Sequence, residues 1–127
     1  MAGSGELQTL TVATAADLSA FQYKVVRGAG AGLCNVASNA ADSDMLGVLQ
    51  NKPESGQAAS VAYGGLSKAV AGASISVWDN LTVNGSGRAI TVTSGSMCLG
   101  QAVEAAGADG DIITVLLSKP VRWAGAP

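Results

Sequence analysis

Residues 47–65 read GVLQNKPESGQAASVAYGG, in which two apolar runs flank a polar turn and the second run ends at paired glycines. In the turn, Pro53 fixes its own φ and Gly56 can adopt a positive φ. The flanking runs, residues 45–50 and 58–63, have the length and the composition of β-strands. The stretch therefore predicts a strand–turn–strand unit, which is a building block of an all-β chain.

The same alternation of strand-like runs and turn residues continues in both directions from this unit. Further runs of strand composition lie at residues 21–27, 33–37, 66–70, 74–77, 81–83, 88–93, 97–105 and 111–117. With a turn signal about every ten residues, the pattern predicts a compact small β-barrel or sandwich. Short helices stay open at residues 13–20 and 101–106, where alanine favours a helix.

The N-terminal segment differs from the rest of the chain because it is poor in large apolar side chains. We expect residues 1–17 to form an extended arm or an edge strand, residues 18–118 the β-domain and residues 119–127 a C-terminal tail. One stretch of the arm has β-propensity. Its residues are Leu7, Thr9, Leu10, Thr11 and Val12. Because such a segment could add a strand to the sheet edge of another protein, we predict these residues to grip a partner.

The two tryptophans receive different interpretations. Trp78 lies among the strand candidates, where packing in the core is the simplest prediction. Arg122 and Trp123 lie in a tail that is too short to form a core of its own. Since tryptophan and arginine are favoured as interface anchors, we predict these two residues to contact a neighbouring subunit.

Composition points toward assembly and away from nucleic acid or membrane. Apolar residues make up 48% of the 127 residues but aromatic residues only 4%, so the core of a monomer is thin. Small scaffolds with thin cores are commonly stabilised by oligomerisation. The net charge of −2 comes with no cluster of basic residues to neutralise phosphates, which argues against a nucleic-acid partner. No apolar run approaches the length that a membrane-spanning helix needs, and no signal peptide is evident.

The cysteines are expected to be free thiols. Cys34 and Cys98 lie far apart in the sequence, and synthesis in a reducing cytosol is the default without an export signal. Both are flanked by strand residues, so we predict small buried core positions and not nucleophiles.

Catalytic and metal-binding chemistry is sparse. The chain contains no histidine, which excludes a Ser-His-Asp or Cys-His arrangement and the commonest zinc ligand. The close acidic pairs, Asp42 with Asp44 and Asp109 with Asp111, lie in loops, where aspartate usually stabilises turns. We therefore predict no enzyme activity, no metal site and no cofactor.

Several of these segments together resemble the decoration (cement) proteins of tailed bacteriophages. The segments are residues 47–53 with Gly56, 59–61, 64–70, 79–83, 87–88, 100–102 and 112–117. The likeness covers residues 10–117 and consists of strand-and-glycine patterns. It implies a β-tulip-like fold and a homotrimer that binds the major capsid protein on the outer surface of the virion. It also implies that the protein stabilises the expanded, DNA-filled head, and that an N-terminal arm becomes ordered on the capsid.

An alternative is a module of a tail fibre, baseplate or cell surface that binds carbohydrate or a protein partner. Carbohydrate sites usually gather several aromatic side chains on one face. This chain has one phenylalanine, two tyrosines and two tryptophans in total. The aromatic content therefore favours the capsid-binding interpretation.

Overall fold

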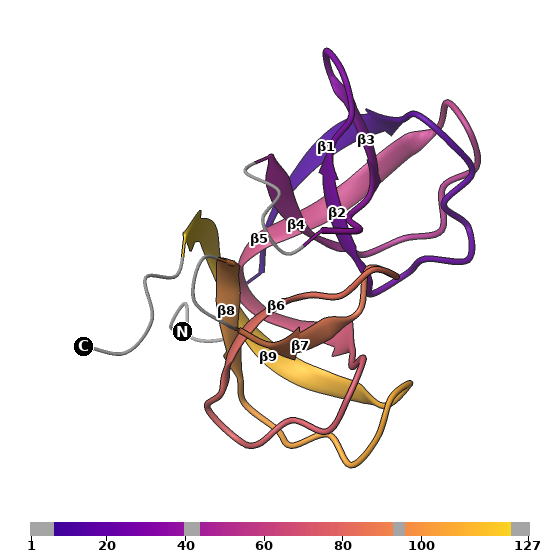
Figure 1. Cartoon of the computed structure of the whole chain (residues 1–127). Coiled ribbons are helices and arrows are strands. Elements are labelled where there is room, and N and C mark those ends of the chain that lie inside the picture. The colour runs from indigo at the N-terminus through magenta and orange to yellow at the C-terminus, as the bar shows by residue number, and fades with distance from the viewer. Residues whose placement is uncertain (1–6, 40–43, 93–95, 123–127) are drawn as a thin grey trace.

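The computed structural model describes residues 7–39, 44–92 and 96–122, and these residues form nine strands and no helix (Figure 1). In chain order the strands are β1 (Gln8–Thr14), β2 (Val25–Gly28), β3 (Leu33–Val36), β4 (Met45–Leu49), β5 (Ala58–Val70), β6 (Asn80–Val83), β7 (Ala89–Thr91), β8 (Met97–Ala102) and β9 (Ile112–Arg122). The prediction of a compact all-β fold is confirmed. Across the same residues, no helix has the length and apolar character that a membrane crossing requires.

The first lobe is a closed barrel. Its strands are ordered β1-β3-β2-β4-β5, and β1 pairs again with β5, so the ring has no gap in the order (Figure 1). All of these pairings are antiparallel except the short parallel contact between β1 and β3. Closure removes most of the free strand edges that an open sheet would leave.

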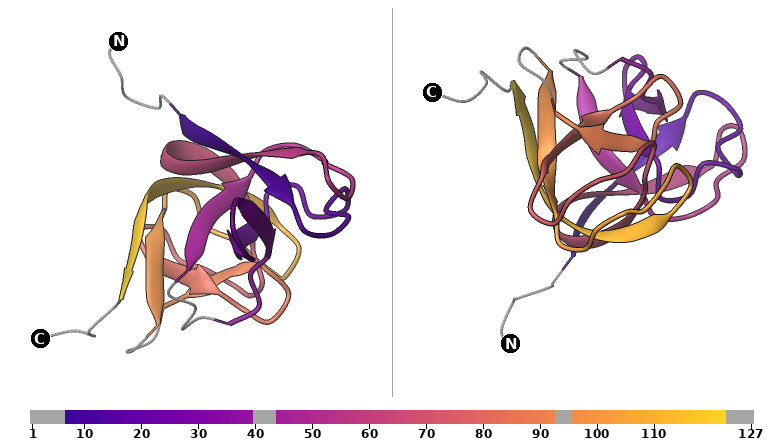
Figure 2. Two further views of the ribbon diagram at one scale, coloured as in Figure 1. Left: turned by 90° about the horizontal axis from the view of Figure 1, so that it is seen from above. Right: turned by 60° about the horizontal axis from the view of Figure 1, so that its bottom comes forward.

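The second lobe is a sheet that shares β5 with the barrel. The second half of β5 pairs with β9, and the order continues to β8, β6 and β7. Figure 2 shows β8 and β9 side by side in this lobe. Gly65, where β5 passes from one sheet to the other, has a φ of 87°, a conformation that glycine adopts without strain. The strands predicted at residues 58–63 and 66–70 are therefore one continuous strand.

The core consists of two clusters, which lie on opposite faces of the barrel strands β2 and β4. Val26 and Leu49 belong to a cluster built only from the barrel region, inside the ring. Their chain neighbours Val25 and Val48 belong to the larger cluster, which also holds residues of the second sheet. Because successive side chains point to opposite faces, β2 and β4 are buried on both faces. This is why β2 and β4 each contain two adjacent apolar residues, Val25-Val26 and Val48-Leu49.

One predicted strand, at residues 21–27, forms only in its second half as β2, and another, at residues 74–77, is wrong. Residues 21–24 form a turn ahead of β2, in which Tyr23 has a φ of 67° and the N–H of Lys24 donates to the carbonyl of Phe21 at 3.0 Å. Residues 74–77 form a loop in which only Ile75 makes a bridge, to Ala106. In both places the local composition suits a strand, but no neighbouring strand runs alongside.

The short helices left open in the sequence are not formed. The N–H of Ala15 donates to Cys34, and that of Leu18 donates to Pro53, both at 2.9 Å. Near the other candidate, the N–H of Val103 donates to Thr114 at 2.9 Å. These long-range hydrogen bonds occupy backbone groups that a helix would have paired locally, so sheet partners override the preference of alanine.

Candidate interaction surfaces

The stretch predicted to grip a partner lies in and beside β1, with its apolar side chains toward the core and its threonines toward solvent. Leu10 and Val12 are half-buried against the barrel core, and Leu7 packs against the larger cluster. Thr9 and Thr11 are exposed. We expected residues 1–17 to lie outside the β-domain, but residues 8–14 form a strand that closes the barrel. The folded unit is thus wider than residues 18–118.

One edge of β1 is largely open among the described residues. Only Ala13 and Thr14 pair with β3, whereas the pairing with β5 continues back to Gln8. The N–H of Ala13 points toward β3, since it donates to the carbonyl of Gly32 at 3.2 Å. Backbone groups alternate in direction along a strand, so those of Thr11 and Thr9 face the same side, beyond the end of β3. This edge can accept a strand from another chain.

Of the two residues predicted to contact a neighbouring subunit, the structure describes only the backbone of Arg122. Arg122 is the last residue of β9 and pairs with Met97 of β8. The side chain of Arg122 and the whole of Trp123 lie outside the part of the chain that the structure describes. Their role in subunit contact stays a prediction.

A surface that the sequence reasoning missed lies on the outer side of the second sheet. Along β9, the side chains of Ile113, Val115 and Leu117 are buried, while Ile112 is 54% and Leu116 is 40% exposed. An antiparallel sheet with one solvated face normally alternates apolar and polar residues. The signal was available in the unbroken apolar character of residues 115–117 and 112–113, which is typical of a strand that is covered on both faces.

Neighbouring strands extend this surface, which we call the outer sheet face. It consists of Leu66, Lys68 and Val70 of β5, Ile112, Thr114 and Leu116 of β9, and Gln101 of β8. The register places Leu116 between Leu66 and Gln101, and Thr114 beside Lys68. The Nζ of Lys68 donates to the Oγ1 of Thr114 at 3.2 Å. The face is therefore apolar with a small polar centre.

Trp78 stands at the border of the outer sheet face, and the prediction that it packs in the core is wrong. The residue is 57% exposed and its φ is 69°, a left-handed conformation that is unfavourable for a non-glycine residue. The N–H of Trp78 donates to the carbonyl of Ala102 at 2.6 Å, and its carbonyl accepts from the Nε2 of Gln101 at 3.5 Å. Hydrogen bonds to β8 thus hold an exposed aromatic residue in a strained backbone conformation.

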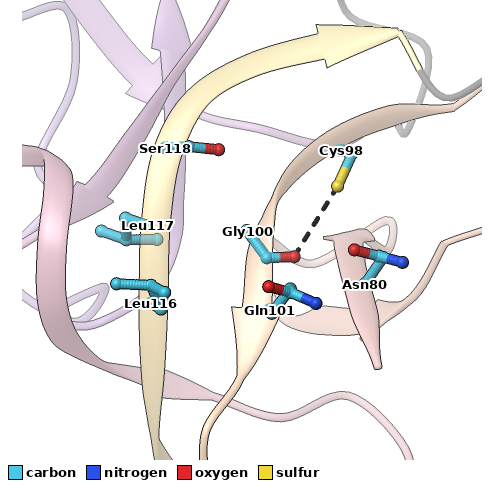
Figure 3. A pocket seen from close by; sticks show the side chains of 7 residues that line it. All are labelled: Asn80, Cys98, Gly100, Gln101, Leu116, Leu117 and Ser118. Carbon is cyan, nitrogen blue, oxygen red and sulfur yellow. Dashed lines mark hydrogen bonds between the residues drawn. The ribbon is translucent and has the colours of Figure 1, made fainter. Parts of the chain in front are cut away.

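A shallow pocket of about 270 Å³ opens beside this border (Figure 3). Its lining residues are Asn80, Cys98, Gly100, Gln101, Leu116, Leu117 and Ser118. Gly100 is required here, because a Cβ atom would lie 2.1 Å from the carbonyl oxygen of Leu116. The lining offers amides, a hydroxyl, the thiol of Cys98 and apolar groups but no carboxylate or amine. It is suited to contact with a neutral surface and lacks a general acid–base pair.

The titratable and nucleophilic groups have structural roles. Cys34 and Cys98 are free and buried, as predicted, and burial raises the pKa of the Cys34 thiol, which lowers its reactivity. Asp109 accepts from Nη1 of Arg88 at 2.6 Å, and Asp111 accepts the backbone N–H of Gly107 at 2.9 Å. The described residues contain no cluster of three or more potential metal ligands.

The remaining acidic pair is described only in part. Asp44 lies 3.8 Å from Nη1 of Arg27, and both side chains are partly exposed. Asp42 lies outside the described residues. Asp111 makes the turn contacts predicted from its loop position, whereas the observed contacts of Asp44 and Asp109 are ion pairs.

The described residues thus form a compact all-β protein with one open strand edge and one exposed apolar sheet face. The sequence model of the phage cement protein family matches residues 2–117. The chain therefore belongs to the phage cement protein family and is a structural, non-enzymatic component of the virion that binds the phage capsid.

A similar solved structure is the head fiber gp8.5 N base in bacteriophage phi29. It is 22% identical in sequence, and the match covers 90% of this chain and 96% of that chain with a TM-score of 0.66. At this identity the likeness establishes the fold. The comparison with curated proteins finds no match.

Proposed function

We propose that this chain is a decoration protein that binds the major capsid protein on the outer surface of a tailed-phage head as a homotrimer. In this role it stabilises the expanded, DNA-filled head. The observation that carries the proposal is the family match over residues 2–117. The protein is made in the cytoplasm of the host bacterium and acts on the virion.

Trimeric binding would make weak individual contacts sufficient. Once one subunit has docked, the contacts of the other two become intramolecular and gain from a high effective concentration. A trimer that bridges neighbouring capsid subunits then resists their separation under internal pressure. This mechanism suits a small domain, which can contribute only a modest contact area per subunit.

The open edge of β1 is the proposed grip on the capsid. The backbone groups of Thr9 and Thr11 are directed to the open side, and a strand of the capsid protein added there would form main-chain hydrogen bonds. Leu7, Leu10 and Val12 support the grip by anchoring β1 on the domain. Arg122 and Trp123 are proposed to contact a neighbouring subunit.

The stabilising role is tested on virions with and without the protein. We expect virions that lack it to lose DNA at a lower temperature, and sooner when divalent ions are chelated. Adding purified protein back should restore the stability. Equal survival of the two kinds of virion would refute the stabilising role.

The grip is tested by co-sedimentation of the protein with empty heads. Thr11→Pro removes the outward N–H without removing a hydrogen bond to β5, since proline is tolerated on an open strand edge. We expect binding to fall at least about tenfold, or about 1.4 kcal/mol. The matched control Thr11→Val keeps the N–H and should bind like wild type. Equal binding by the proline variant, with an unchanged melting temperature, would place the grip elsewhere.

A further inference from the structure

We infer that the shallow pocket of Figure 3, together with the exposed Trp78 beside it, binds one sugar ring of a neutral glycan. This activity goes beyond the proposed docking on the capsid and does not depend on it. The inference rests on the backbone conformation of Trp78, on polar groups of the pocket that have no partner, and on a lining without charge.

Trp78 occupies a turn position that normally holds glycine or asparagine. The N–H of Asp79 donates to the carbonyl of Ser76 at 3.1 Å, which closes a four-residue turn. Trp78 is the third residue of this turn and has a φ of 69°. A positive φ at the third position favours glycine or asparagine, so tryptophan lowers the stability of the chain here. Because strained residues of this kind are concentrated at functional sites, the strain points to a function for the indole.

Hydrogen bonds hold this turn in place before any ligand arrives. The N–H of Trp78 donates to the carbonyl of Ala102 at 2.6 Å, and the N–H of Ala102 donates to the carbonyl of Asp79 at 2.9 Å. The carboxylate of Asp79 accepts from the N–H of Ser76 at 3.0 Å and from the hydroxyl of Thr91 at 3.1 Å. A preorganised aromatic residue loses little entropy on binding. Trp78 thus offers a fixed apolar surface on which the C–H groups of a sugar ring can stack.

The pocket beside Trp78 supplies hydrogen-bonding groups that have no partner within the described part of the chain. Asn80 and Ser118 line the pocket, and their side chains make no hydrogen bond with any other described residue. Gln101 also lines it and donates only one long hydrogen bond, of 3.5 Å, from its Nε2 to the carbonyl of Trp78. Amides and hydroxyls both donate and accept, and so do the hydroxyl groups of a sugar. The free groups therefore match a ring that carries several hydroxyls.

The lining selects a neutral sugar over an acidic ligand or a protein chain. None of the seven lining residues is charged, so a carboxylate or phosphate would lose its hydration without gaining a cation. Leu116 and Leu117 are the only large apolar residues of the lining, whereas the core of a protein–protein interface is richer in such side chains. The volume of about 270 Å³ lies below the ~300 Å³ at which sites for drug-sized ligands begin, and it suits a single ring.

A site with one aromatic residue binds a sugar weakly. Because few contacts are available, we expect a dissociation constant of about 1 mM or weaker for a single sugar. Copies of the chain on one virion would bind a surface coated with glycan together, and the avidity would raise the apparent affinity. The low aromatic content, which argues against a chain devoted to carbohydrate, is sufficient for such a site.

The first experiment titrates the isotope-labelled full chain with glucose, galactose, mannose and N-acetylglucosamine and follows its NMR spectrum. The side-chain amides of Asn80 and Gln101 and the indole N–H of Trp78 give signals at the site itself. We expect at least one neutral sugar to shift these signals in a saturable way. Glucuronic acid should bind at least about tenfold more weakly than the best neutral sugar, because no cation of the lining meets its carboxylate.

The second experiment repeats the titration with variants. Trp78→Gly removes the indole and suits the left-handed backbone, and Asn80→Ala removes one amide. Each should weaken sugar binding at least about tenfold. The matched control Tyr63→Ala removes an exposed aromatic side chain from the barrel part of β5 and should bind like wild type. Melting curves establish that each variant is folded.

Two results would overturn the inference. One is the absence of any shift with every neutral sugar up to about 100 mM, where a site with a dissociation constant of about 1 mM is saturated. The other is unchanged sugar binding by folded Trp78→Gly and Asn80→Ala. If wild type binds no sugar and Trp78→Gly loses self-association or sedimentation with empty heads, the surface belongs to a second copy or to the capsid protein. Sugar binding by a chain that does not sediment with heads would instead refute the proposed function and uphold this inference.

Discussion

The barrel and the second sheet both contain strands with adjacent apolar residues, but they differ in how many faces of these strands are buried. In the barrel, β2 and β4 carry adjacent apolar residues, and the chain itself covers both of their faces. In the second sheet, β9 carries an equally apolar run, but only the face toward the larger cluster is covered. The difference shows that the barrel covers both faces of its apolar strands, whereas the second sheet leaves apolar residues of one face exposed.

Removing β1 should lower the stability most, because β1 closes the barrel. Deleting residues 2–13 takes away nearly all of β1, uncovers the edge of β5 and exposes Val61 inside the ring. We expect the melting temperature to fall by about 10 °C or more, or the cooperative transition to disappear. Circular dichroism during heating measures this.

A shorter deletion of residues 2–6 is the control, since it leaves β1 intact. It should melt close to wild type. If the longer deletion also melts like wild type, β1 is dispensable for the barrel, and residues 1–17 behave as the independent arm that the sequence suggested.

Truncating one leucine in each lobe compares how well the two lobes bury their apolar side chains. Leu49→Ala leaves a cavity in the barrel core, where the side chain is fully buried, and should cost about 3 kcal/mol. Leu116→Ala truncates a residue that is 40% exposed, and in the monomer it should cost less than about 1 kcal/mol. Urea unfolding at low protein concentration compares the two. Equal losses would mean that the outer sheet face is already covered within one chain.

The left-handed backbone at Trp78 predicts that glycine is more stable than alanine at this position, the reverse of the usual order. At most positions alanine is more stable than glycine, but at a φ of 69° the Cβ atom is unfavourable. Trp78→Gly should therefore be more stable than Trp78→Ala by about 1 kcal/mol. Urea unfolding of the two variants measures the difference. The reverse order would show that residue 78 does not hold the left-handed conformation in solution.

Acid should produce the smallest effect, at Glu104, whose carboxylate accepts the backbone N–H of Thr114. The hydrogen bond from the backbone N–H of Thr114, with a smaller contribution from the charge of Lys68, lowers the pKa of Glu104. A lowered pKa in the folded state stabilises the fold above the unfolded value of about 4.3, and this contribution is lost as pH falls through the folded value.

Glu104→Gln should thus be slightly less stable than wild type at neutral pH. The difference should vanish at acidic pH, below the lowered pKa. Thermal melts between neutral and strongly acidic pH provide the comparison. A difference that is constant over this range would exclude the ionisation of Glu104 as its cause.

The sequence alone determined those features that depend on local chemistry. Gly56 adopts the positive φ expected of its turn, at 83°, and the cysteines are free and buried. The absence of histidine from all 127 residues excludes several catalytic arrangements by itself, because the side chain that they require does not occur in the chain. Period-two runs separated by turn residues were sufficient for the all-β class.

Only the tertiary structure decided which strands meet and which faces stay open. β1 is part of the barrel because its backbone groups pair with β5, far along the chain, and no local pattern encodes that partner. Trp78 is exposed because hydrogen bonds to Gln101 and Ala102 hold its loop outside the core. Strand pairing is non-local, so composition predicts that a run becomes a strand but not what will cover its second face.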